Sequence, residues 1–75
     1  MDTTPADVLA SLSHQLKHRN AQLAEWRTCA LEEARYQELH KRSELAAAAR
    51  TRSAQYEGLM LENQCTINFL ESEPT

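Results

Sequence analysis

The sequence has few of the residues that interrupt helices. Its 75 residues include one glycine, Gly58, and two prolines, Pro5 and Pro74, which both lie near the ends. Folds made of β-strands need frequent turn residues, which this chain does not supply. The abundant residues are alanine, leucine, glutamate, glutamine and arginine, all strong helix formers. The sequence therefore predicts an all-α protein.

Large apolar side chains are also scarce. Aromatic residues make up 5% of the chain, and alanine supplies a large share of the 41% that is hydrophobic. A compact chain of this size buries only about 60% of the surface that it exposes when unfolded. We therefore expect the apolar residues to be covered by other helices rather than within a monomeric globule.

No apolar run approaches the roughly 20 residues that span a bilayer, and the N-terminal segment does not resemble a signal peptide. Cys29 and Cys65 match no CxxC or zinc-ligand spacing. These patterns predict no membrane segment, two reduced thiols and an intracellular location, cytoplasmic or nuclear.

Motifs that carry chemistry are missing as well. There is no glycine-rich phosphate loop, no nucleophile elbow and no pair of carboxylates that would face a pocket. His14 and His18 stand four residues apart, but no third ligand lies on their helix face. We expect no enzymatic activity, no metal, no cofactor and no small-molecule substrate.

The charge distribution is uneven. All eight lysines and arginines fall between Lys17 and Arg52, which gives an excess of basic residues there, while both ends are acidic and the net charge is −3. This basic middle makes a nucleic-acid-associated helix a distant alternative function. The interspersed glutamates argue against it, because a nucleic-acid site needs basic residues that outnumber the acids on one face.

Helix boundaries can be read at both ends. Thr4 is a suitable N-cap, Pro5 suits the first helical position, and Asp7 can return a hydrogen bond to the cap. Pro74 disfavours helix before it, so the helix should end near residues 70–72. We therefore predict an N-terminal cap at 1–4, a helical oligomerisation region at 5–72 and a C-terminal tail at 73–75.

Apolar residues recur at alternating steps of three and four, which is typical of coiled coils. A first stripe spans 9–30 and a second spans 46–70, displaced by two residues from the phase of the first, so a phase change falls within 31–45. The residues that we predict at an oligomer interface are Leu9, Leu12, Leu16, Leu23, Trp26, Ala30, Ala46, Ala49, Tyr56, Met60, Asn63, Ile67 and Leu70.

Two architectures are compatible with these stripes. The first is a long, essentially continuous helix that forms a coiled coil or helix bundle by oligomerisation. The second is an antiparallel hairpin, with a turn near 39–43, that dimerises into a four-helix bundle; it would set Leu16 opposite Asn63 and Leu23 opposite Tyr56. Residues 38–43 contain no glycine, proline, asparagine or aspartate. This absence favours the continuous helix.

The C-terminal third carries further apolar residues outside the second stripe. Leu59, Leu61, Cys65 and Phe69 would form a possible face for a partner protein. We therefore expect a non-enzymatic scaffolding module that self-associates as a dimer or tetramer and recruits another helical protein. The alternative is a helical subunit of a heteromeric complex that is stable only with its partner.

Overall fold

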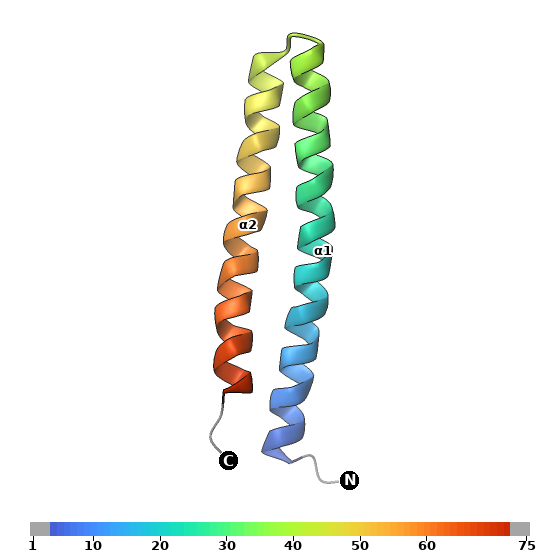
Figure 1. The fold of residues 1–75 in the computed structure, drawn as a ribbon. Coiled ribbons are helices and arrows are strands. Elements are labelled where there is room, and N and C mark those ends of the chain that lie inside the picture. Colours follow the sequence, from blue (N-terminus) through green and yellow to red (C-terminus); the bar gives the residue numbers. More distant parts are fainter. Residues whose placement is uncertain (1–3, 73–75) are drawn as a thin grey trace.

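The computed structural model describes residues 4–72, which form two antiparallel helices, α1 (Pro5–Leu39) and α2 (Ser43–Glu71). The helices lie side by side in a rod whose longest dimension is 57 Å (Figure 1). The predicted all-α class is confirmed. The chain reverses at residues 40–42, so the hairpin, which was the alternative, replaces the continuous helix that the sequence favoured.

The predicted helix boundaries are also found. The Thr4 hydroxyl accepts a hydrogen bond from the Asp7 backbone N–H at 3.2 Å, and the Asp7 carboxylate accepts one from the Thr4 backbone N–H at 3.4 Å. This reciprocal capping box satisfies two amides that the helix leaves unpaired. The second helix ends at Glu71, within the predicted range. The predicted tail at 73–75 and residues 1–3 of the predicted cap lie outside the described residues.

The turn is built from backbone hydrogen bonds rather than from a turn-forming residue. The backbone N–H of Lys41 donates to the carbonyl of Glu38 at 3.0 Å, and that of Arg42 donates to the carbonyl of Gln37 at 2.8 Å. This pair of bonds is the Schellman motif that ends many helices. The motif needs a left-handed residue, usually glycine, and Lys41 takes that place with a φ of 58°.

The turn and the facing apolar stripes explain why the chain forms a hairpin and not the continuous helix that the sequence favours. The Schellman motif satisfies carbonyls at the end of α1 without any side chain, so the lack of turn residues does not prevent a reversal. The reversal also lets each helix cover the apolar stripe of the other. The buried apolar side chains lie between the helices: Leu23, Ala30, Ala34, Ala46, Ala49 and Ile67.

Candidate interaction surfaces

The face of α2 that is turned toward α1 coincides with the predicted second stripe. Every position of this stripe is buried or half-buried, and all other described positions of α2 are exposed. The stripe is covered by α1 of the same chain, and its predicted contact with a second chain stays a prediction. Its members are Ala46, Ala49, Ser53, Tyr56, Met60, Asn63, Ile67 and Leu70.

The covered face of α1 differs from the predicted first stripe at every second position. Leu9, Leu16, Leu23 and Ala30 are buried or half-buried as expected, but Leu12 and Trp26 are 43% and 46% exposed. At these alternate positions the covered residue is the one that follows the predicted residue in the sequence. The steps along the covered stripe are therefore four and then three residues. It continues without a break to the end of α1, through Ser13, Asn20, Arg27, Ala34 and Gln37.

The pairing of the helices is shifted by about one helical turn from the predicted one. The sequence placed Leu23 opposite Tyr56, whereas the structure sets Trp26 against Tyr56 with ring centroids 5.9 Å apart. It placed Leu16 opposite Asn63, whereas Asn20 takes that position. The shift arises because the turn is centred on Lys41, while the predicted pairing required a turn centre between residues 39 and 40.

A pair of asparagines joins the two helices in the half-buried interior. The side-chain amide of Asn63 donates to the side-chain oxygen of Asn20 at 3.0 Å, and the Asn20 amide donates to the backbone carbonyl of Met60 at 3.2 Å. A polar residue in an apolar stripe can fix the register of two helices because any other register leaves it unpaired. Asn63 stood out in the sequence, but Asn20 did not. The signal in the sequence that could have identified Asn20 is its spacing of four residues from Leu16.

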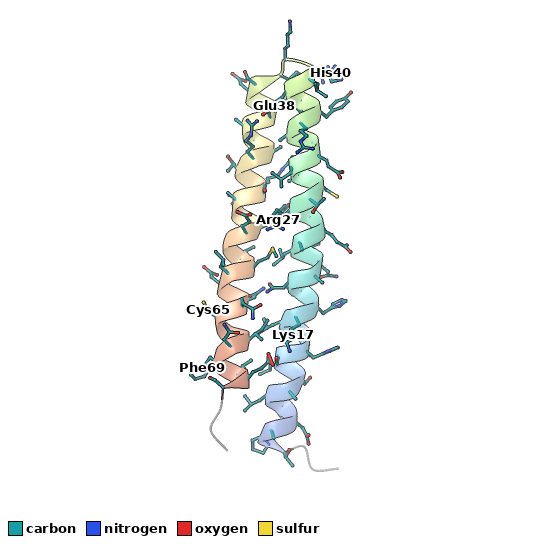
Figure 2. The ribbon with its side chains drawn as sticks, in the orientation of Figure 1. Lys17, Arg27, Glu38, His40, Cys65 and Phe69 are labelled. Atoms are coloured by element: carbon teal, nitrogen blue, oxygen red, sulfur yellow. The ribbon has the colours of Figure 1, made fainter. Side chains whose placement is uncertain are left out.

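The four residues predicted as a partner face are all exposed, but they do not form one surface. Leu59 and Leu61 are two residues apart, so their side chains leave the helix about 200° from each other. Leu61, Cys65 and Phe69 follow one another at four-residue steps, and Figure 2 shows Cys65 and Phe69 on the outer side of α2, turned away from α1. Leu59 lies on the side of α2 opposite to Leu61.

Three ion pairs connect the helices along one long side of the hairpin. Lys17 contacts Glu71 at 3.0 Å, Arg27 contacts Glu57 at 3.2 Å, and Arg50 contacts Glu38. Lys17, Arg27 and Glu38 lie along this side in Figure 2. Exposed pairs of this kind contribute little to stability, roughly 0–1 kcal/mol each. They nevertheless mark this side as polar, and we call it the ion-pair face.

A fourth pair lies on the opposite long side, where Arg52 contacts Glu33 at 2.8 Å. Two of the basic residues in the middle of the sequence, Arg50 and Arg52, are thus each paired with a carboxylate of α1. This pairing reduces the positive charge that the middle of the chain presents to a polyanion.

Membrane-spanning helices and metal sites need features that are absent from residues 4–72. Neither α1 nor α2 combines the length and apolarity needed to cross a bilayer. Among residues 4–72, histidine, cysteine, aspartate and glutamate side chains do not gather in threes as a metal site would require. Cys29 and Cys65 are both exposed and not joined to each other.

Comparison with known proteins adds no relative. No protein-family model, no curated protein and no solved structure matches this chain.

Proposed function

We propose that this chain is a non-enzymatic assembly module whose hairpin associates with its own copies into a helix bundle. The support comes from the distribution of apolar side chains. Only two large ones, Leu23 and Ile67, are buried among the described residues, and the rest of the buried apolar set is alanine. Ten large apolar side chains of the same part of the chain are exposed.

This imbalance is the observation that carries the proposal. Two packed helices have little interior, and an antiparallel pair normally completes its core by packing against further helices. Burying a large apolar side chain is worth about 1.5–3 kcal/mol relative to leaving it in water. Association of hairpins would therefore gain free energy that the single hairpin forgoes.

Sedimentation equilibrium together with circular dichroism tests self-association. At tens of micromolar we expect a helical species whose mass is a multiple of 8.5 kDa and whose helicity increases with protein concentration. A fully helical monomer over the same range would contradict the proposal.

A heteromeric subunit is the second candidate, favoured by the outer side of α2. Leu61 and Phe69 are 68% and 70% exposed there, and Cys65 lies between them on the same face. In this case α2 would recruit a helix of another protein, and the isolated chain would be a poorly folded monomer. Light scattering and circular dichroism of the isolated chain distinguish the two, because a homo-oligomer needs no second protein.

A further inference from the structure

The exposed apolar side chains are concentrated on the long side opposite the ion-pair face. Residues seven apart share one side of a helix, and we call such a series of residues a row. Trp26 and Arg52 line one shallow groove on this side, and Arg19 and Thr66 line another, so the rows of the two helices adjoin. We call this surface the Trp26 face. Its exposed large apolar residues are Val8, Leu12, Trp26, Tyr36, Leu45, Leu59 and, at its edge, Phe69.

The ion-pair face has far fewer such residues. It carries Leu31 of α1, which lies in the same row as Lys17 and Glu38, and Leu61 of α2, which lies beside the Arg27–Glu57 ion pair. Seven of the ten exposed large apolar side chains thus belong to the Trp26 face and two to the ion-pair face. A concentration of exposed apolar side chains on one face is typical of interaction surfaces.

The charges of the Trp26 face are few and balanced. Its rows contain two basic residues, Arg19 and Arg52, and two acidic residues, Glu33 and Glu62. Glu33 and Arg52 lie at the same height along the rod because they form an ion pair. Arg19 lies at the height of Thr66, one helical turn from Glu62. At each of these two positions along the rod, one helix thus carries a positive charge and the other helix a negative charge.

We infer that a second copy of this chain covers the Trp26 face, related by a two-fold axis parallel to the helices, so that the two turns lie beside each other. This inference rests on the proposed self-association and names its surface. Such an axis sets α1 of one copy over α2 of its partner at equal height. Trp26 then faces the row of the partner's Leu59, and Tyr36 faces the row of the partner's Leu45.

The same axis matches the charges. Glu33 of one copy lies over the row of the partner's Arg52, and Arg19 lies over that of the partner's Glu62. Opposite charges meet in both places, as in other complementary interfaces. The four helices form a ring in which every neighbour is antiparallel, which is the usual arrangement of a four-helix bundle.

The surface is large enough for a stable dimer. A face two helices wide measures about 20 Å across, at ~10 Å per helix, and the rod is 57 Å long. A standard interface buries roughly 800 Å² on each partner. The Trp26 face exceeds this area without any contribution from the turn or the tails.

Two leucines of α2 provide a matched test by sedimentation equilibrium. Leu59 lies on the Trp26 face and Leu61 beside the ion-pair face. We expect Leu59→Glu to raise the dissociation constant of the dimer at least about 30-fold, as loss of a central interface residue does. Leu61→Glu should change it less than about threefold, because that side chain stays in water.

Circular dichroism of both variants controls for folding. If Leu59→Glu does not fold, Trp26→Ala replaces it, with Leu31→Ala as its equally exposed control on the other face. Weakening by Leu61→Glu and not by Leu59→Glu would overturn the assignment of the face while self-association stands. A wild-type chain that stays monomeric would instead refute the proposed function itself.

The direction of the second copy is tested by a spin label near the turn. The label is placed by Glu44→Cys in a chain that also carries Cys29→Ser and Cys65→Ser. Turns that lie side by side should give a distance below about 35 Å, given ~10 Å between neighbouring helices. A distance near 50 Å, the approximate length of a 35-residue helix at ~1.5 Å per residue, would overturn the turn-beside-turn arrangement.

Discussion

The half of the hairpin near the turn and the half near the chain ends are held together by different side chains. Near the turn the buried apolar residues are all alanines: Ala30, Ala34, Ala46 and Ala49. Toward the ends they are larger, with Leu23 and Ile67 buried and the Asn20–Asn63 pair between them. In the half near the turn, small side chains let the two helix backbones approach closely. In the half near the chain ends, large side chains fill the space between the helices.

The two halves should respond oppositely to changes in side-chain size. An alanine interface has no room for added atoms, whereas an interface of large side chains loses contacts when atoms are removed. If the hairpin also associates, its stability depends on protein concentration, so each variant must be compared with the wild type at one fixed concentration.

Removing volume from the end half should have the largest effect. Ile67 is 1% exposed, and we expect Ile67→Ala to lower the free energy of unfolding by about 2–5 kcal/mol through lost burial and the cavity that remains. Urea unfolding followed by circular dichroism measures this change. Leu61→Ala is the control on an exposed position of the same helix and should change stability by less than about 0.5 kcal/mol. Equal losses in both variants would show that Ile67 is not an interior residue.

Adding volume to the turn half should destabilise the hairpin next most strongly. Ala49 is 0% exposed, and Ala49→Leu forces the helices apart, at a cost of about 1–3 kcal/mol. The same substitution at the neighbouring exposed position, Ala48→Leu, should be close to neutral. Thermal unfolding of the two variants makes the comparison, and a tolerated Ala49→Leu would contradict the close approach of the helices.

The asparagine pair should contribute a smaller, coupled effect. We expect Asn20→Ala and Asn63→Ala each to cost about 1 kcal/mol, and the double variant to cost less than the sum, because each single variant leaves a half-buried amide without its partner. A double-mutant cycle in urea should give a coupling free energy of about 0.5–1.5 kcal/mol. Strict additivity would mean that the two side chains do not interact.

The turn should become more stable when its strained residue is replaced. Lys41 has a φ of 58°, where a side chain is disfavoured, so Lys41→Gly should raise the free energy of unfolding by roughly 0.5–1 kcal/mol. Lys41→Ala keeps the Cβ atom and should leave stability nearly unchanged. If both variants behave alike in thermal unfolding, the left-handed conformation of this residue does not limit stability.

Several features of the molecule could be predicted from local signals. The capping box at Thr4 and Asp7 depends on residues three apart, so the sequence locates it without knowledge of the fold. The residues of α2 that α1 covers follow the predicted repeat, because a single helical periodicity describes them from Ala46 to Leu70. Their predicted contact with a second chain stays a prediction.

On α1, local periodicity does not by itself show which residues α2 covers. Leu12 and Trp26 fit a repeat of three and four residues, whereas Ser13 and Asn20, which α2 covers, fit a repeat of four and three. Antiparallel packing against α2 selected the second repeat and left the larger side chains beside the interface. Which residues belong to an interface between chains, including the predicted partner face, stays a prediction.

Local signals in the sequence are enough to show that this chain is helical, where the first helix begins, where the second ends, and that two apolar stripes are out of phase by two residues. How the chain absorbs that phase difference depends on its tertiary structure. In a continuous helix a displacement of two residues turns the stripes about 200° apart, so no single straight partner could cover both. The reversal at Lys41 turns the stripes toward each other, and this gain in burial depends on contacts between residues far apart in the sequence.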